Sequence, residues 1–223
     1  MARARRKKNQ AVRMERCSEY WFRVPVANRG KWRSVFGGEP QLLYVELGCG
    51  KGSFLCAMAE RHPDISFIGI EKEESVILSA MEKIAAAGLH NVRFICADVD
   101  LLRNYFAPGE IDRIFIHFCD PWMRKNKPKR RLTYRDKLKM YAELMAPGSE
   151  LHFKTDEPSL FAFSLEEFDA AGYRVLFSTT DLYNSPMIEG NIATEFERGF
   201  VADGLPICRL VAKHQTEKGE LSF

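Results

Sequence analysis

Long hydrophobic runs are missing from this sequence. None of its apolar stretches approaches the roughly 20 residues that a membrane-spanning helix needs. The start, residues 1–8, is basic, but no apolar segment follows it, so it lacks the form of a secretory signal. We therefore expect a cytoplasmic protein with no membrane partner.

Closely spaced metal-binding residues are missing too. The 6 cysteines are scattered and form no C-x-x-C pair, and the 5 histidines show no ligand spacing either. Four of the cysteines lie inside apolar runs, as small core side chains do in a reducing compartment. We expect no metal site.

A large net charge is also absent, but the local charge is uneven. The formal net charge is only +3. Two basic segments, residues 1–16 and 124–139, together carry +14, which leaves −11 for the rest of the chain. An acidic body with two basic segments is typical of a protein that binds a polyanion, and the pair favours nucleic acid over an ordinary solvated surface.

Strands and helices alternate along most of the chain. Short apolar runs bounded by Gly, Pro or Asp indicate buried strands, and apolar residues at helical spacing indicate helices between them. We predict strands at 42–46, 65–71, 92–96, 111–118, 149–154, 173–180 and 206–212, and helices ending at 61, over 73–87, 134–145 and 158–171, and from about 194 to 204. Such alternation is typical of a mostly parallel sheet with helices on both faces.

Two of these helices allow a finer prediction. Pro147 and Gly148 should stop the helix that precedes the fifth strand, since neither residue continues a helix well. The helix at 73–87 should bury one face, which consists of Val76, Ile77, Ala80, Met81 and Ile84.

Acidic residues follow the predicted strands. Glu46, Glu71, Asp98, Asp120 and Asp156 each lie at or just past a strand end. In an open α/β sheet, ligands bind at the carboxyl ends of the strands, near the point where the strand order reverses. We therefore expect these carboxylates to belong to one site.

A glycine loop follows the first strand. Gly48, Gly50 and Gly52 have the spacing G-x-G-x-G, whereas the G-x-G-x-x-G of dinucleotide binders and the G-x-x-x-x-G-K-[ST] phosphate loop are both absent. Glycines let a ligand approach the backbone closely. Glu46, just before the loop, would repel a pyrophosphate and suits a cationic ligand, such as the sulfonium and amino groups of S-adenosylmethionine (SAM).

The pattern E-x-G-x-G-x-G resembles motif I of the class I SAM-dependent methyltransferases. The resemblance implies a Rossmann-like fold with a mostly parallel seven-stranded sheet, helices on both faces and an antiparallel last strand. It also implies that Glu46, Gly48 and Gly50 bind SAM. In the same way, Glu71 would bind the ribose hydroxyls and Asp98 would contact the adenine.

The fourth strand ends in Asp120-Pro121-Trp122, with a run of cations behind it. Proline fixes the turn, the indole offers a stacking face and the carboxylate accepts hydrogen bonds, which together suit a nucleobase pocket. Residues 120–132 are similar, over all 13 positions, to the signature D-P-W-P-K-K-R-H-x-K-R-R-L of the tRNA (guanine-N7)-methyltransferase family. They depart from it at Met123, at Arg124, and at 126–127, where Asn-Lys replaces Arg-His.

Two later segments extend this resemblance. Residues 153–156 are similar to the family's F-K-T-D, and residues 190–197 are similar to its G-N-x-x-T-x-[FY]-E. The resemblance covers most of the chain, from about residue 31 to the last strand. It implies a basic N-terminal extension at 1–30, a SAM-dependent methyltransferase domain at 31–213 and a tail at 214–223.

The resemblance implies tRNA as the substrate and guanine N7 as the methyl acceptor. N7 has a free lone pair and no proton to lose, so transfer depends on holding donor and acceptor in line rather than on a strong base. Asp120 takes the central role, because a placed carboxylate stabilises charge on the guanine, and it would also border the cofactor. Substrate contacts are implied for Arg124, Asp156, Thr194, Glu195, Phe196 and Glu197, and RNA contacts for Asn126, Lys127, Pro128, Lys129, Arg130 and Arg131.

Three other interpretations stay open at this point. A methyltransferase for exocyclic base amines has a related motif and differs in its product. A small-molecule methyltransferase is disfavoured by the two basic segments. A non-catalytic RNA-binding module with a degenerate fold is disfavoured by the intact Glu46, Glu71 and Asp120. The modified position in tRNA and the oligomeric state, monomer or homodimer, also stay open.

Overall fold

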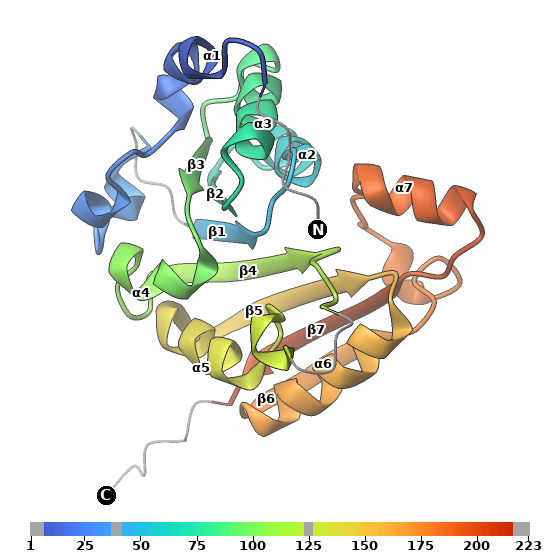
Figure 1. The fold of residues 1–223 in the computed structure, drawn as a ribbon. Coiled ribbons are helices and arrows are strands. Elements are labelled where there is room, and N and C mark those ends of the chain that lie inside the picture. The colour runs from blue at the N-terminus through green and yellow to red at the C-terminus, as the bar shows by residue number, and fades with distance from the viewer. Residues whose placement is uncertain (1–6, 37–41, 123–126, 216–223) are drawn as a thin grey trace, which may run out of the picture.

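One sheet of seven strands forms the centre of the structure, a computed structural model that describes residues 7–36, 42–122 and 127–215 (Figure 1). The strand order is β3-β2-β1-β4-β5-β7-β6, and neighbours are parallel except where β7 pairs with β5 and β6. The predicted mostly parallel sheet with an antiparallel last strand is therefore confirmed. The strands are β1 (Leu42–Leu47), β2 (Ile65–Glu71), β3 (Val92–Cys96), β4 (Ile111–His117), β5 (Met145–Thr155), β6 (Tyr173–Thr179) and β7 (Cys208–His214).

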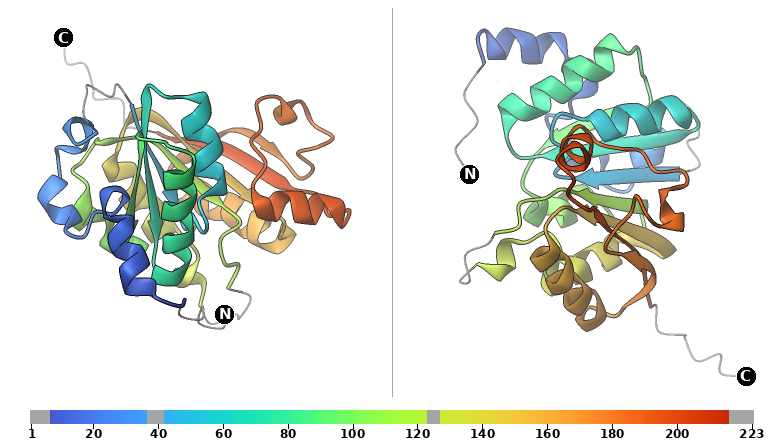
Figure 2. Two further views of the ribbon diagram at one scale, coloured as in Figure 1. Left: turned by 90° about the horizontal axis from the view of Figure 1, so that it is seen from above. Right: turned by 90° about the vertical axis from the view of Figure 1, so that its right-hand side faces the viewer.

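Helices lie on both faces of the sheet, as predicted (Figure 2). One apolar core includes residues of α1, α2 and α3, and the other includes residues of α4, α5 and α6. None of the helices in the described ranges is long and apolar enough to cross a membrane. The helices are α1 (Gln10–Arg16), α2 (Ser53–Arg61), α3 (Glu74–Ala86), α4 (Leu102–Tyr105), α5 (Arg135–Leu144), α6 (Pro158–Ala170) and α7 (Glu195–Ala202).

The strands β2 and β3 have the bounds that their apolar runs predict. In β2 every residue from Ile65 to Ile70 is buried, because parallel strands in the middle of a sheet are covered on both faces. Gly69 in this strand leaves room for its neighbours: a Cβ there would lie 2.7 Å from side-chain atoms of Leu55 and Phe94. A continuous apolar run was therefore a reliable signal for a central strand.

The boundary between α5 and β5 differs from the prediction. We expected Pro147 and Gly148 to separate the helix from the strand, but α5 ends at Leu144 and β5 begins at Met145. The register between β4 and β5 shifts between Ile111 and Arg113, which places Pro147 and Gly148 in an irregular stretch of the strand. A proline, which donates no N–H, and a glycine with a φ of 78° both suit such a bulge.

Helix α3 is buried over a broader arc than its apolar pattern predicts. Val76, expected in the buried face, is only half-buried, whereas Ser75 and Leu78 are buried together with the other predicted residues. The helix packs against α1 as well as against the sheet. The prediction assumed that α3 has one contact face, and it therefore missed the residues that a second neighbour buries.

Helix α1 itself was not predicted, because polar contacts hold it in place. The Arg13 guanidinium donates to both carboxylate oxygens of Glu82 on α3, at 2.6 and 2.7 Å. Gln10 Nε2 donates to Glu74 at 2.7 Å. Because polar side chains make these contacts, the sequence of α1 has no apolar periodicity from which the helix could be predicted.

The N-terminal segment packs first against α3 and then against the edge of the sheet, within the range where we expected a basic extension. The backbone N–H of Phe22 donates to the carbonyl of Phe94 on β3 at 2.9 Å. Trp32 is fully buried, and its Nε1 donates to the carbonyl of Tyr105 at 2.8 Å. The segment thus covers the edge strand β3 and contributes to the core.

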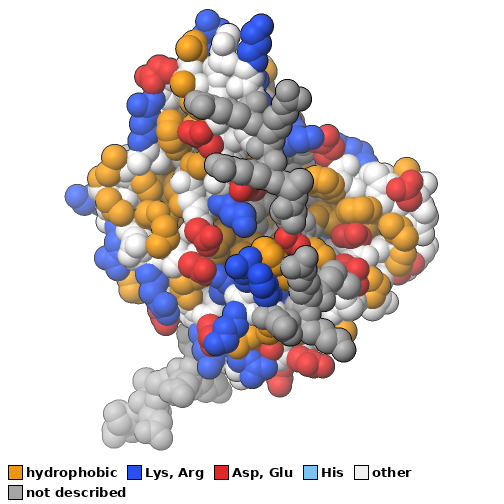
Figure 3. All heavy atoms as spheres, in the orientation of Figure 1, with side chains coloured by type: hydrophobic (Ala, Val, Ile, Leu, Met, Phe, Trp, Pro, Cys, Tyr) orange, Lys and Arg blue, Asp and Glu red, His pale blue; other side chains and the backbone are white. Residues whose placement is uncertain are grey.

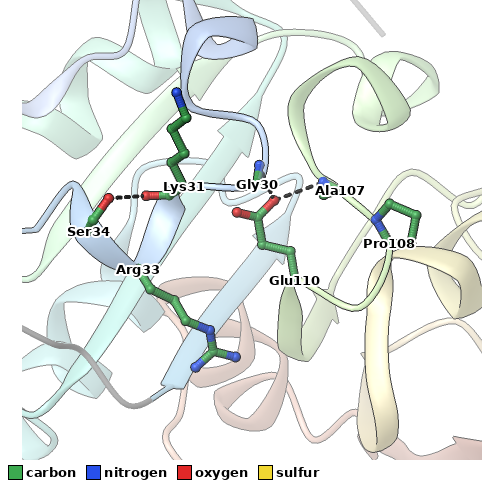
Figure 4. A pocket seen from close by; sticks show the side chains of 7 residues that line it. All are labelled: Gly30, Lys31, Arg33, Ser34, Ala107, Pro108 and Glu110. Atoms are coloured by element: carbon green, nitrogen blue, oxygen red, sulfur yellow. Dashed lines mark hydrogen bonds between the residues drawn. The ribbon is translucent and has the colours of Figure 1, made fainter.

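A hollow of about 400 Å3 lies beside this segment, near the amino ends of β1 and β4 (Figure 4). Its acid, Glu110, accepts backbone N–H bonds from Gly30 at 3.0 Å, Trp32 at 3.0 Å and Ala107 at 2.8 Å. A carboxylate with this many donors holds loops together. The hollow is at the opposite end of the strands from the acids that the sequence singles out.

Candidate active site at the carboxyl edge of the sheet

The strand order brings four of the predicted acids to one edge. Strands β2, β1, β4 and β5 are consecutive neighbours and run parallel, so their carboxyl ends meet at one edge of the sheet. In Figure 1 the arrows of β1, β4 and β5 point to this edge on the right. Glu71, Glu46, Asp120 and Asp156 lie at or after these four ends. The strand order reverses between β1 and β4, which is where open α/β sheets bind ligands.

The three glycines of the loop between β1 and α2 all adopt left-handed backbone conformations. Gly48, Gly50 and Gly52 have φ values of 72°, 56° and 71°, a region that favours glycine. Gly48 N–H donates to the carbonyl of Ile70 at 2.8 Å, which fastens the loop to β2. A Cβ on Gly50 would meet nothing within 4 Å, so open space lies above the loop.

Glu46 is a buried acid with unused hydrogen-bonding capacity. Its side chain is 4% exposed, and Oε2 has no hydrogen-bond partner among the described residues. Oε1 lies 3.4 Å from Nδ1 of His117 on β4. Burial raises the pKa of Glu46 well above its usual range, against the opposing effect of Lys154. An unpaired buried carboxylate oxygen beside an open glycine loop fits the cationic amino group of SAM. Binding of that cation would favour the charged form of Glu46.

Glu71 and Asp98 extend this edge along β2 and β3. Glu71 is half-buried, and its carboxylate accepts the backbone N–H of Gly50 at 3.3 Å and of Glu73 at 3.0 Å. Asp98 is exposed, and its Oδ1 accepts the N–H of Asp100 at 3.0 Å. Each carboxylate can still accept hydrogen bonds from a ligand. A ribose hydroxyl and an adenine amine are donors of the required kind.

The segment after β4 holds Asp120 on a strained backbone. Phe118 and Trp122 have φ values of 50° and 44°, which non-glycine residues rarely adopt and which cost about 1–3 kcal/mol each. Asp120 is half-buried, and its Oδ1 accepts the N–H of Trp122 at 3.2 Å. Strain of this kind is typical of a functional site, where the surrounding structure fixes a side chain in one direction.

Cations surround Trp122. The guanidinium of Arg130 lies 4.8 Å from the centre of its ring, and Nζ of Lys72 lies 5.9 Å away. Arg131 Nε donates to the carbonyl of Pro121 at 2.9 Å. Lys129 and Arg130 are exposed, and Lys127, Pro128 and Arg131 are half-exposed. Cationic side chains thus border the Asp120 segment directly. Lys and Arg side chains gather in the lower centre of the face that Figure 3 shows.

Some cations of the two basic segments form ion pairs within the protein. Arg135 forms a two-pronged ion pair with Glu167, at 2.6 and 2.9 Å, and Lys137 pairs with Asp100. In the first basic segment Arg13 pairs with Glu82. The cations left free for a polyanion are therefore fewer than the sequence suggests. Arg124 and Asn126, two of the predicted RNA or substrate contacts, lie outside the described residues.

The predicted substrate-binding segment at 194–197 divides into two pairs. Thr194 and Glu197 are buried and form a capping box: Thr194 Oγ1 accepts the Glu197 N–H at 3.0 Å, and Glu197 Oε2 accepts the Thr194 N–H at 3.3 Å. Glu195 and Phe196 are exposed, and Glu195 lies 3.6 Å from Lys51 of the glycine loop. Of these four residues, only the exposed pair presents its side chains to solvent.

A buried lysine that the sequence did not single out anchors this segment to the sheet. Lys154 Nζ on β5 donates to Glu197 Oε2 at 2.5 Å, to the carbonyl of Ile192 at 3.0 Å and to Asn191 at 3.2 Å. Tyr183 donates to the other Glu197 oxygen at 3.2 Å. Burial lowers the pKa of Lys154, and Glu197 counters that effect. The F-K-T-D motif contains Lys154, which was the available signal.

Asp156 follows β5 beside this network. It is half-buried, and burial raises its pKa. On the other side of the network, the ring of Phe200 in α7 lies 5.7 Å from that of Phe118, which follows β4. Helix α7 is thereby attached over the carboxyl edge of β4 and β5 (Figure 2, right).

Comparison with known proteins agrees with this geometry. A family model described as "putative methyltransferase" matches residues 40–210. The tRNA (guanine-N(7)-)-methyltransferase of Bacillus subtilis (strain 168) is 43% identical over 192 residues, which cover 86% of this chain and 89% of that protein. The chain belongs to the tRNA (guanine-N7)-methyltransferase family.

Solved structures outside the tRNA (guanine-N7)-methyltransferase family share the fold. An antibiotic-related methyltransferase superposes with a TM-score of 0.62 at 19% identity and covers 82% of this chain and 92% of its own. The 16S rRNA (adenine(1408)-N(1))-methyltransferase of Catenulisporales acidiphilia, solved as a point mutant with SAM, gives 0.57 at 13% identity, with 84% and 91% covered. At these identities the comparison establishes the Rossmann-like fold alone.

Proposed function

We propose that this protein transfers the methyl group of SAM to N7 of a guanine in tRNA. The observation that carries the proposal is the position of Asp120, which a strained segment holds at the switch point of the sheet, between the glycine loop and a set of exposed cations. We assign the reaction to the domain at 31–213 and, with tRNA as substrate, to the cytoplasm.

On the cofactor side, SAM would lie over the glycine loop. Gly48 and Gly50 allow its close approach, and the orphaned Glu46 oxygen would accept from its amino group. Glu71 would bind the ribose and Asp98 the adenine, since both follow the next strands along the sheet edge. SAM supplies an activated methyl group on sulfur, and the residues around it only have to orient it.

On the substrate side, Asp120 would face the guanine. An N7 nucleophile loses no proton, so the chain has to orient the base and stabilise the positive charge that it gains. Asp156 and the exposed pair Glu195 and Phe196 would border the base, whereas Thr194 and Glu197 would position that pair. Arg124 and residues 126–131 would contact the tRNA.

The decisive experiment is nucleoside mass mapping of tRNA incubated with the protein and SAM. We expect 7-methylguanosine at a single position. A methylated exocyclic amine would identify a different base methyltransferase, and tRNA that binds without acquiring a methyl group would identify a binding module.

Glu71→Ala is expected to weaken SAM binding by roughly tenfold, as expected for the loss of hydrogen bonds to a charged group. The carboxylate both orders the loop through Gly50 N–H and would bind the ribose. Isothermal titration calorimetry measures the affinity, with Glu60→Ala at the exposed end of α2 as the control. Unchanged SAM affinity in Glu71→Ala would move the ribose site elsewhere, and tRNA affinity should stay near that of wild type.

Neutralising Lys129, Arg130 and Arg131 to Gln should flatten the salt dependence of tRNA binding. Each lost phosphate contact lowers the slope of log affinity against log salt by roughly 0.7–0.9, so three contacts give about 2–3. Filter binding across a salt series measures the slope. Arg103→Gln, on α4 and paired with Glu143, is the matched control and should leave the slope unchanged. Equal slopes for the triple variant and wild type would remove these residues from the tRNA interface.

A further inference from the structure

One half of one sheet face is polar, although the rest of the sheet is covered by apolar packing. On β4, Ile114 and Ile116 point into the core formed with α5 and α6, and the residues that alternate with them point the other way. The same alternation continues through β5 and β7. The opposite face therefore presents Arg113, Phe115 and His117 on β4, Glu150, His152 and Lys154 on β5, and Arg209, Val211 and Lys213 on β7.

A pocket of about 200 Å3 lies on this polar half-face, between α2 and residues 190–192. Its described lining includes four Lys or Arg side chains and three histidines, and no Asp or Glu. The cations come from four elements: Arg61 from the end of α2, Arg113 from β4, Lys154 from β5 and Arg209 from β7. Convergence of cations without a lining carboxylate is the chemistry of an anion site.

The hydrogen-bonding capacity of the lining is only partly used. Arg113 pairs with Glu150 at 3.1 Å through one terminal nitrogen, while its Nε is buried with no hydrogen-bond partner in the described part of the chain. Arg209 Nη1 donates to the carbonyl of Met187 at 2.7 Å. Arg61 is exposed at the rim. Each guanidinium has five N–H donors, so all three retain donors for a ligand.

Two histidines lie beside the cationic side chains of the pocket. The side chain of His117 is 4% exposed, and its Nδ1 has no hydrogen-bond partner among the described residues. Burial lowers its pKa well below the usual range, and Lys154 and Arg209 lower it further. Burial also lowers the pKa of His152, with Arg113 and Arg209 acting in the same direction and Glu150 against it. An anion in the pocket would lie beside Arg113, Lys154 and Arg209 and would interact favourably with them.

We propose that this pocket binds a phosphate group, and that in the enzyme–tRNA complex the group is a backbone phosphodiester. Its volume of about 200 Å3 is below the ~300–1,000 Å3 of pockets for drug-sized ligands, so it suits a single phosphate rather than a nucleotide. Arginine forks match the oxygen geometry of phosphate.

The location of the pocket gives tRNA a second point of attachment. Residues 127–131 precede α5, which packs on the other face of the sheet. The pocket and these residues therefore lie on opposite faces of the sheet, whose carboxyl edge holds Asp120. A tRNA held on both sides of the edge has its target base fixed between two backbone contacts. This second statement rests on the proposed function, whereas phosphate binding itself does not.

The first test titrates the protein with inorganic phosphate, without tRNA or SAM, and follows the histidine ring protons by NMR. His62, His117 and His152 line the pocket, and His90 and His214 do not, so the protein has internal controls. We expect saturable shifts for the three lining histidines only. Absence of a saturable shift, or equal shifts in all five, would overturn the site.

Variants make this test specific. Arg209→Gln should weaken phosphate binding by roughly tenfold, as a lost charge-assisted hydrogen bond does. Arg61→Gln, at the exposed rim, should weaken it by roughly two- to fivefold without disturbing the fold. Arg103→Gln removes the same charge from α4 on the other face and should leave phosphate affinity unchanged. Equal phosphate affinity in Arg61→Gln, Arg209→Gln and Arg103→Gln would contradict the proposal.

A second arm identifies the source of the phosphate. If it belongs to tRNA, inorganic phosphate competes with tRNA for binding, and Arg61→Gln and Arg209→Gln each lower the salt slope by about 1. Saturable phosphate binding with unchanged tRNA affinity in both variants would assign the pocket to free phosphate and refute the tRNA assignment. Since the histidine titration needs no methyl transfer, a failure of the proposed activity leaves its outcome interpretable.

Discussion

Asp120→Ala is expected to lower kcat by about 10²–10³-fold, the usual loss when one preorganised contact to the transition state is removed. The carboxylate lies in a segment whose backbone is strained at Phe118 and Trp122, so its direction is fixed before substrate binds. Turnover is measured with both tRNA and SAM saturating, which separates the transfer step from binding. Near-wild-type turnover under these conditions would place the site on another strand.

Asp120→Asn distinguishes charge stabilisation from base catalysis at the same position. The amide keeps an acceptor and loses the charge, so we expect turnover between that of wild type and Asp120→Ala. A role in proton removal would instead make Asn as inactive as Ala, with activity that follows the titration of one acid. For attack by N7 we expect no such dependence, because no proton leaves the nucleophile.

Lys154→Met is expected to lower the free energy of unfolding by about 3–5 kcal/mol, because removal of one partner leaves the other charge of a buried ion pair uncompensated. Lys154 and Glu197 are 3% and 0% exposed and 2.5 Å apart. Denaturant unfolding measures the loss. Hydrogen exchange at the Thr194 and Glu197 amides should quicken as well, since this pair holds their segment on β5.

Two further variants identify the source of that loss. Lys154→Met combined with Glu197→Met replaces both charges by apolar side chains and should recover most of the stability, because no unpaired charge remains. Lys51→Met breaks another Lys–Glu pair to α7, in which both side chains are 55% exposed, and should cost within about 1 kcal/mol. Similar losses for Lys51→Met and Lys154→Met would show that burial of the pair is unimportant.

The sheet was predictable from the sequence because its signals are local. The strands β2 and β3 are continuous apolar runs between polar turns, and acids mark the ends of β1, β2, β4 and β5. The glycine loop has the spacing G-x-G-x-G, and all three of its glycines adopt the left-handed backbone that favours glycine. The identity and order of the strands, and the position of the acids at their ends, therefore follow from short stretches of chain.

The functions of individual polar residues were less predictable, because they depend on distant partners. Glu197 was predicted to contact substrate, yet its side chain is buried against Lys154, 43 positions away in the sequence. Helix α1 is held to α3 by the ion pair of Arg13 with Glu82, across a separation of 69 residues, and by the hydrogen bond from Gln10 to Glu74. A sequence window reveals a charged residue but not whether its partner is another side chain or a ligand.

The polar half-face was detectable in principle. Arg113 and His117 alternate with Ile114 and Ile116 in β4, and Glu150 and Lys154 alternate with apolar residues in β5. Such alternation is the signal of a strand with one polar face. It was obscured because a parallel sheet is expected to have two apolar faces. In this sheet α2 and α3 pack mainly on β2 and β3, which leaves this side of β4, β5 and β7 polar.

The place of β7 between β5 and β6 also determines which strand has to dock before the sheet is complete. In the described structure β6 has β7 as its one sheet neighbour, and β7 also occupies the open edge of β5. Both edges therefore stay unpaired until Cys208–His214 has docked, and unpaired edges are where strands from other chains attach. A chain in which residues 208–214 have not yet docked would thus expose two unpaired strand edges to neighbouring chains and chaperones.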